Sequence, residues 1–473
     1  MQDSLPGGHS HGLDAGPGAD AALTGPGGSR GRVVTALAAI LVPVTLLLVA
    51  AMIALWPSGS HRELSLADPY GTASGVTLFS GTVTAVEPRD CGPQAGALET
   101  PGGAVVGAGA AAQVRCVDAI VDPDGGGTDA ARVPVPPEVG ASRDVAVGDR
   151  IKALDLSALP GGTAGGPADG AGASGAVDYV FVDFERTVPV VALAALYALV
   201  VVLVARWRGV RAILGLGLAF TVLFWFMVPA LLEGGPPLWV GLVGCSLIMV
   251  VVLYFAHGFS LRTTTALLGT LIGLGLTAVL AAWGTDAAAL TGMGDEYSYV
   301  LAAVAPEVRL SGIVLCGLLV AGLGVLNDVT ITQSSAVWEL QSANPRASAR
   351  ELFAAGMRIG RDHIASTVYT IAFAYAGAAL PLLIVVSLYD RSLADTLLSA
   401  ELVEEVVRIL VGSIGLVLAI PVTTAIAVGV ARSVQAHPHA QPGVQAQSEA
   451  DVQTQPEAVS TDPARGQRRD AGR

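Results

Sequence analysis

The sequence predicts a mainly α-helical, polytopic membrane bundle of about eight transmembrane helices, with a small extracytoplasmic β-rich domain between the first two helices. Of the 473 residues, 52% are hydrophobic and only 14% are charged, whereas a soluble domain carries about a quarter charged residues. Apolar runs of about 20 residues recur, each long enough to cross about 30 Å of hydrocarbon. The net charge of −13 argues against a nucleic-acid partner. The apolar runs make the lipid bilayer the expected partner.

The chain begins with a Gly/Pro-rich tail, residues 1–32, which is predicted to be a disordered cytoplasmic segment. The apolar run 33–56 follows Arg30 and Arg32, as the core of a signal peptide would. It is longer than a signal core, however, and no clear small-residue cleavage site follows it. We therefore predict a transmembrane anchor at residues 33–56.

Residues 57–186 are predicted to form the extracytoplasmic β-rich domain, and residues 187–431 a seven-helix transmembrane domain. The C-terminal residues 432–473, rich in Gln, Ala, Glu and Pro, are predicted to be a disordered cytoplasmic tail. The seven expected spans are residues 187–205, 212–232, 238–257, 265–283, 310–326, 367–388 and 406–431. With the anchor counted as span one, these are spans two to eight. In spans five and six, five glycines favour close helix packing: Gly269, Gly273, Gly317, Gly322 and Gly324.

The orientation in the cell membrane follows from the arginines of the short loops, because cytoplasmic loops carry an excess of basic residues. The basic loops hold Arg206, Arg208 and Arg211 between spans two and three, Arg262 between spans four and five, and Arg346, Arg350, Arg358 and Arg361 between spans six and seven. The alternate loops are poor in basic residues. Both termini are therefore predicted to be cytoplasmic and the β-rich domain extracytoplasmic.

The β-rich domain is predicted from segments in which apolar and polar residues alternate, as in half-buried strands. These segments are residues 76–86, 113–121, 144–154 and 177–184, and they are compatible with a small β-barrel or OB-like sandwich. Ligand or wall contact and a structural cap over the bundle both remain open as its role. Cys91 and Cys116 either pair as a disulfide, as suits an extracellular loop, or remain free thiols.

A polar and acidic stretch directly follows the apolar run 313–326 and is the first candidate functional surface. If the run continues as one helix, Asp328, Thr332, Ser335 and Glu339 fall at i, i+4, i+7 and i+11. That spacing places two carboxylates and two hydroxyls on a single helix face. Such a face at the end of a transmembrane helix is either buried against partners or lines water.

A second polar segment follows Asn344-Pro345, a natural helix break. A new amphipathic helix is expected from about Ala347, with Arg358 and Asp362 four residues apart on one face as an ion pair would require. We expect the two segments to converge at the cytoplasmic ends of spans six and seven. The candidate polar site is Asn327, Asp328, Thr332, Ser335, Glu339, Arg358, Arg361 and Asp362. It is either an ion, proton or substrate site or a set of structural ion pairs that joins two helix ends.

The sequence has no Walker motif, no HExxH or GxSxG motif and no closely spaced Cys/His quartet. We therefore expect no cofactor, no metal and no catalytic residue, although Ser334, Ser335 and Asp328 keep a membrane-embedded enzyme as a third hypothesis. The first hypothesis is a transporter or permease component that moves a small solute or ion. The second is a membrane scaffold or envelope-assembly protein that acts through the extracytoplasmic domain. The oligomeric state is not predicted.

Two motifs resemble the YibE/F family of bacterial multipass membrane proteins. The first motif is matched by Asp328, Ser334, Ser335, Glu339 and Leu340, and the second by Gly356, Ile359, Gly360, Arg361, Asp362, Thr367, Ala374, Tyr375 and Gly377. The five residues after Asp328, Val-Thr-Ile-Thr-Gln, depart from the small and Met-like residues that are more usual there. The resemblance covers roughly residues 75–430. It implies an N-terminal anchor, a β-rich extracytoplasmic region and about seven further helices, but no particular activity.

Overall fold

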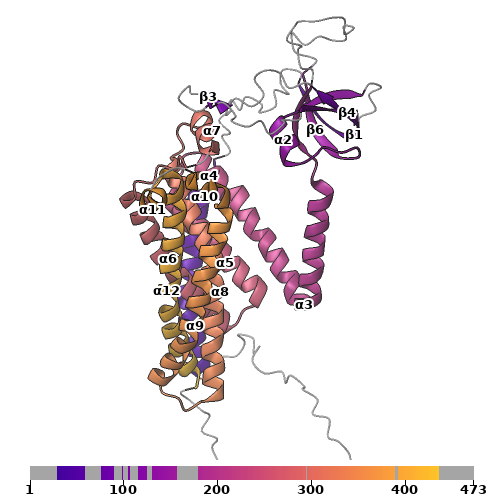
Figure 1. Cartoon of the computed structure of the whole chain (residues 1–473). Coiled ribbons are helices and arrows are strands. Elements are labelled where there is room, and N and C mark those ends of the chain that lie inside the picture. Colours follow the sequence, from indigo (N-terminus) through magenta and orange to yellow (C-terminus); the bar gives the residue numbers. More distant parts are fainter. Residues whose placement is uncertain are drawn as a thin grey trace, which may run out of the picture.

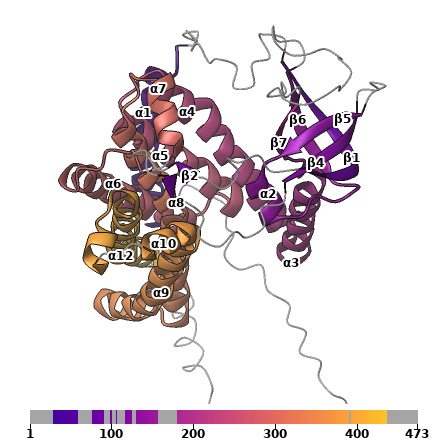
Figure 2. The same ribbon diagram turned by 45° about the horizontal axis from the view of Figure 1, so that its top comes forward.

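The computed structural model describes residues 29–58, 76–89, 98–99, 105–106, 116–124, 130–156, 179–294, 296–388 and 392–435. Helices in this part of the chain form an elongated bundle, and a separate β-sheet unit stands beside it, joined through helix α3 (Figures 1 and 2). The two predicted tails lie outside the described residues, except where the first helix begins at Ser29 and the last ends at Gln435. Cys91 also lies outside them.

Six helical stretches are long and apolar enough to cross a membrane, or up to seven if a bent helix pair counts as one span. This composition bears out a membrane helix bundle. The long helices are α1 (Ser29–Ala54), α3 (Thr187–Val222), α5 (Pro237–His257), α6 (Leu261–Ala287), α8 (Leu310–Ala343), α9 (Ala349–Ala378) and α12 (Ala400–Gln435). Short helices are α2 (Pro137–Ser142), α4 (Val228–Leu232), α7 (Glu296–Val304), α10 (Leu380–Ser387) and α11 (Leu393–Leu397).

Helix α3 reverses direction at Arg206 and continues through the π-helical segment η2 (Leu223–Met227) into α4. Arg206 has φ 54° and ψ −133°, a conformation that is strained for a residue with a side chain. The two legs of α3 form a V (Figure 1), and they approach closely beside the bend. A Cβ on Gly209 would lie 2.5 Å from the carbonyl oxygen of Val201, so glycine is required there.

Helix α9 ends at Ala378, and α10 continues from Leu380 at an angle of 66°. Pro381 lies in the first turn of α10 and has no N–H to donate back to α9, so it cannot continue that helix. The bend therefore coincides with a proline. The helix break expected at Asn344-Pro345 is also present, since α8 ends at Ala343 and α9 begins at Ala349.

The β-sheet unit is a five-stranded antiparallel sheet of order β5-β4-β1-β6-β7. Its strands are β1 (Thr77–Arg89), β4 (Cys116–Pro123), β5 (Ala131–Val135), β6 (Arg150–Asp155) and β7 (Tyr179–Phe184), and a separate ribbon pairs β2 (Leu98–Glu99) with β3 (Val105–Val106). Four of the five strands overlap the predicted alternating segments. The fifth, β5, was not predicted because it is only five residues long and contains Pro134.

The sheet unit has its own core, in which alternate residues of each strand point inward. Val83, Val121, Val133 and Ile151 are all buried there. Cys116 is disulfide-bonded; its predicted pairing with Cys91 stays a prediction, because Cys91 lies outside the described residues. The two cysteines of the bundle, Cys245 and Cys316, are buried free thiols.

Helices α6, α8 and α12 form the centre of the bundle, and glycines allow two of them to meet closely. A Cβ on Gly269 would overlap the Thr423 side chain of α12, and one on Gly273 would lie 3.0 Å from the Cβ of Ala419. The predicted packing role is therefore confirmed for these two glycines. It is wrong for Gly317 and Gly324 among the described residues, because nothing lies within 4 Å of a Cβ placed there.

Candidate functional site

Helix α8 is continuous from Leu310 to Ala343, so the predicted polar face exists. Asp328, Thr332 and Glu339 are exposed and Ser335 is half-buried. The face therefore lies on the outer side of α8, away from the centre of the bundle. The prediction placed the residues on one face correctly, but it did not establish that this face points outward.

Asp328 on α8 lies opposite His363 on α9, with 3.7 Å between Asp328 Oδ2 and His363 Nε2. This distance exceeds a hydrogen bond, but it allows an ion pair when the imidazole is protonated. Among the described residues, His363 Nε2 and Asn327 Oδ1 are buried and have no hydrogen-bond partner, which requires explanation in a stable fold.

The depth of this pair follows from the packing of α8 against α5. Gly312 of α8 packs so tightly on Pro237, the first residue of α5, that a Cβ there would overlap the proline ring. Helix α5 has 21 residues, about 31 Å at 1.5 Å per residue, which matches the hydrocarbon thickness. Counting the same rise along α8 from Gly312 reaches Thr332. Asp328 is therefore about one helical turn on the bilayer side of the end of α5.

Glu339 belongs to a different contact, because its carboxylate pairs with Arg262 at the start of α6 at 3.1 Å. Ser334 also donates a hydrogen bond to the Arg262 carbonyl oxygen at 3.0 Å. These two contacts join the end of α8 to the start of α6. The structural interpretation of the acidic residues, in which ion pairs join helix ends, therefore describes Glu339 well.

Arg358, Arg361 and Asp362 lie on the exposed face of α9. Within the described part of the chain they form no ion pair. The expected pair between Arg358 and Asp362 is therefore absent among the described residues, and the two segments meet instead at Asp328–His363 and at Gln333. The helical i, i+4 spacing permits a pair, but two exposed side chains gain little from forming one.

Helix α9 starts with a capping box in which Ser348 and Glu351 exchange hydrogen bonds. The backbone N–H of Ser348 donates to the Glu351 carboxylate at 2.8 Å. This hydrogen bond holds the pKa of Glu351 below its ordinary value, because it favours the charged carboxylate. The cap fixes where α9 begins and hence which of its residues meet α8.

A row of buried polar side chains, here called the polar seam, lies on the other side of α8. It comprises Thr270, Thr330, Gln333 and Thr424, none of which is more than 3% exposed. The hydroxyl oxygens of Thr270 and Thr330 are 2.6 Å apart. Gln333 Nε2 donates to the Gly356 carbonyl oxygen at 2.9 Å and to Thr424 Oγ1 at 2.7 Å. The seam thus joins α6, α8, α9 and α12 inside the apolar bundle.

Glycines of the second motif let α9 approach this seam. A Cβ on Gly356 would lie 3.0 Å from Thr424 Cγ2, and one on Gly360 would lie 2.6 Å from Ile420 Cγ2 and 3.2 Å from Gln333 Oε1. The two motifs therefore meet mainly through their buried faces, with Asp328–His363 as a further contact between them. Sequence reasoning missed this because it followed charges. The sequence signal was the pair of glycines four residues apart, together with a glutamine in an otherwise apolar helix.

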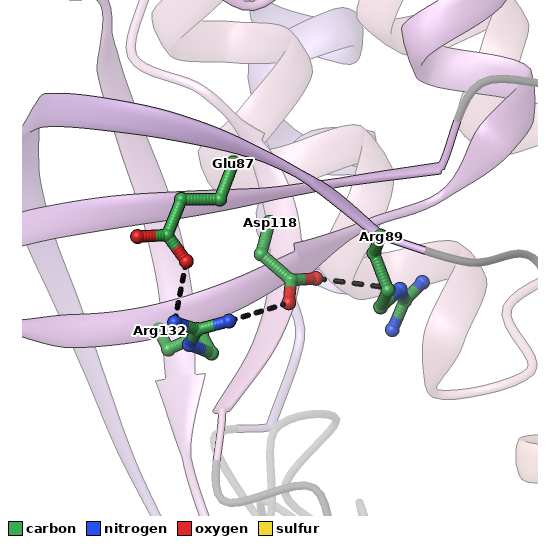
Figure 3. A network of polar contacts seen from close by, with 4 residues as sticks. All are labelled: Glu87, Arg89, Asp118 and Arg132. Atoms are coloured by element: carbon green, nitrogen blue, oxygen red, sulfur yellow. Dashed lines mark hydrogen bonds and ion pairs between the residues drawn. The ribbon is translucent and has the colours of Figure 1, made fainter.

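The sheet unit carries a separate charged network (Figure 3). Asp118 on β4 is only 5% exposed and lies between two arginines: Arg89 Nε and Arg132 Nη1 are each 3.3 Å from its carboxylate oxygens. Arg132 also contacts Glu87. The network pairs a buried carboxylate with two exposed guanidiniums across three adjacent strands, and removing those partners would leave a buried charge unpaired.

No group of three His, Cys, Asp or Glu side chains within the described residues is arranged to hold a metal ion. The bundle instead offers the Asp328–His363 pair between α8 and α9 and a neutral polar seam on the other side of α8. The long apolar helices of the chain define it as a polytopic membrane protein.

A family model described as YibE/F-like protein matches residues 193–433. The match covers half of the chain and includes both motifs. The chain belongs to the YibE/F-like protein family. No curated protein and no solved structure matches it.

Proposed function

We propose that the protein is a permease that moves a small solute or ion across the cell membrane, with Asp328 and His363 as its protonation site. The observation that supports the proposal is the position of this pair along α8, about one turn before the level at which α5 ends. Ionisable groups at such a depth are rare and mark ion, proton or substrate pathways.

Solvation supports the same proposal. The Asp328 side chain is 69% exposed on the surface of this single chain. A charged carboxylate costs about 2.5–3.5 kcal/mol at the centre of a membrane helix on insertion scales, and less toward its ends. An exposed carboxylate on a membrane helix is therefore best accommodated where water or a partner group reaches it. Binding and release of a proton there changes its attraction to His363, and this is the elementary step that couples a proton to helix movement.

The proposal includes a topology of eight spans. The two legs of α3, on either side of Arg206, each count as a span, and α9 with α10 counts as one bent span. With both termini in the cytoplasm, as the arginine distribution predicts, the sheet unit lies outside the membrane.

The test uses the full-length protein in liposomes that contain the pH-sensitive dye pyranine, with a panel of amino acids, sugars, organic acids and inorganic ions added outside. Wild-type protein is expected to change the internal pH with at least one member of the panel. Asp328→Asn and His363→Gln are expected to abolish that change. Glu339→Gln is the matched control, because Glu339 lies on the same face of α8 but about 16 Å further along the helix. Panel-wide silence of the wild type, or equal rates for wild type and Asp328→Asn, would contradict the proposal.

A second candidate function, scaffolding through the sheet unit, is favoured by the separate core of this unit and by its charged network. Deletion of residues 65–180 discriminates between the two functions. Solute movement in liposomes is expected to survive the deletion at least in part if the bundle is a permease. If the protein is a scaffold, neither the full-length protein nor the deletion variant moves a solute in liposomes. The deletion then abolishes the function of the protein in cells.

A further inference from the structure

A lateral groove of about 870 Å³ lies between α1, the second leg of α3 and α5. Its walls are almost entirely apolar, and Arg211 is the charged residue that lines it among the described residues. We propose that this groove binds a phospholipid with a negatively charged headgroup, with an acyl chain along α1 and α5 and the phosphate at Arg211. The inference concerns a different part of the bundle from the Asp328–His363 pair and does not depend on the proposed function.

The groove is suited to an acyl chain because it opens sideways, toward the bilayer. Leu46 of α1 and Phe259 after α5 line it and are 64% and 69% exposed. Tyr254 stacks on Phe259 with their ring centroids 4.5 Å apart. The Tyr254 hydroxyl is 3.2 Å from that of Thr264, so this polar group of the α5 side of the groove already has a hydrogen-bond partner. Apolar surface of this kind is covered by hydrocarbon in a membrane.

The choice of an anionic headgroup rests on Arg211. This side chain is half-buried against the groove and forms no ion pair or hydrogen bond with any described residue. A guanidinium binds phosphate oxygens through two parallel hydrogen bonds. Arg206 and Arg208 are exposed at the bend of the same helix, so the mouth of the groove is basic.

The level of Arg211 in the membrane agrees with this assignment. The groove is lined by Gly258, Phe259 and Leu261, which form the turn between α5 and α6. This end of the bundle is therefore at the lipid headgroups, and the arginine distribution predicts it to be cytoplasmic. Basic pockets between transmembrane helices on that side bind anionic lipid headgroups. An apolar ligand from the aqueous phase would have to pass the basic mouth of the groove, whereas an anionic lipid binds there through its headgroup.

The experiment is native mass spectrometry of the full-length protein extracted from vesicles of equal parts dioleoylphosphatidylcholine and dioleoylphosphatidylglycerol. Wild-type protein is expected to retain phosphatidylglycerol over phosphatidylcholine, and Arg211→Gln to reduce that preference about fivefold, as expected for the loss of one basic contact. Arg211→Lys is expected to keep most of it. Arg309→Gln is the control, because Arg309 is exposed at the opposite end of the bundle, at the start of α8.

A second variant tests the acyl-chain part. Ala38 lines the groove from α1, and Ala38→Trp is expected to reduce retention of both lipids by filling the groove. An unchanged melting temperature in detergent confirms that each variant is folded. Equal phosphatidylglycerol preference in wild type and Arg211→Gln, undiminished retention in folded Ala38→Trp, or dimers that replace bound lipid in the spectra would each overturn the proposal.

Discussion

The glycines of α9 allow the packing of the two motifs to be tested by a graded series of substitutions. Carbon atoms pack best at about 3.5–4.0 Å. A Cβ on Gly377 meets nothing within 4 Å, one on Gly356 meets Thr424 Cγ2 at 3.0 Å, and one on Gly360 meets Ile420 Cγ2 at 2.6 Å. We therefore expect the stability of the three Gly→Ala variants to fall in that order.

The magnitude follows from two opposing terms. Each substitution replaces a glycine of α9 by alanine, which favours the helix by up to about 1 kcal/mol in its interior and by less at Gly377, the last residue but one of α9. Overpacking costs about 1–3 kcal/mol and applies fully to Gly360 only. At about 2–4 °C per kcal/mol for 150–250 residues, Gly360→Ala is expected to melt about 2–12 °C below Gly377→Ala, with Gly356→Ala in between.

The assay uses a thiol-reactive fluorescent dye during heating in detergent. Cys245 in α5 and Cys316 in α8 are buried free thiols, so they become reactive when the bundle unfolds. Gly377→Ala is the matched control, because it lies in the same helix and shares part of the gain in helix propensity. The same melting temperature for Gly360→Ala and Gly377→Ala would refute the conclusion that α9 packs on α12 at Gly360.

Further outcomes concern the polar seam and the sheet unit. Gln333→Leu leaves two acceptors without their donor and is expected to cost about 1–2 kcal/mol in the same melting assay; an unchanged melting temperature would contradict the observed bonds. In the sheet unit, replacing Arg89 and Arg132 together by Met leaves the buried Asp118 carboxylate unpaired, and is expected to cost about 3–5 kcal/mol. Asp118→Ala removes the partner of the exposed Arg89, whereas Arg132 keeps its contact with Glu87, so this variant is expected to cost less. Rates of proteinase K cleavage within residues 116–156 of the full-length chain measure both, and equal rates would count against a buried charge at Asp118.

The sequence predicted the membrane bundle, most of its helices and four strands, because these depend on local patterns. Uninterrupted apolar runs determine spans, and alternation determines strands. The reversal inside α3 was also predictable, since Arg206 and its basic neighbours interrupt an apolar stretch. Strand β5 is too short and too proline-rich for its pattern to stand out.

The site was harder to predict, because periodicity shows which residues share a face but not what that face meets. Asp328 and Glu339 share the predicted face, yet one lies beside His363 and the other pairs with Arg262. Both partners come from other helices, so their distances depend on packing between helices. Gly356 and Gly360 set the register of α9 against α8. This register depends on packing between helices, so the spacing of charges within one helix does not predict it.

That register gives the two sides of α8 a mechanical relation. Asp328 and Gln333 are five residues apart, about 140° around the helix, and each contacts α9: Asp328 at His363 and Gln333 at the Gly356 carbonyl oxygen. A movement of α9 relative to α8 must therefore change both contacts together. The hydrogen bond of Gln333 joins neutral groups, so a change at the Asp328–His363 contact leaves it in place. We therefore expect α9 to pivot near Gln333 rather than to detach from α8.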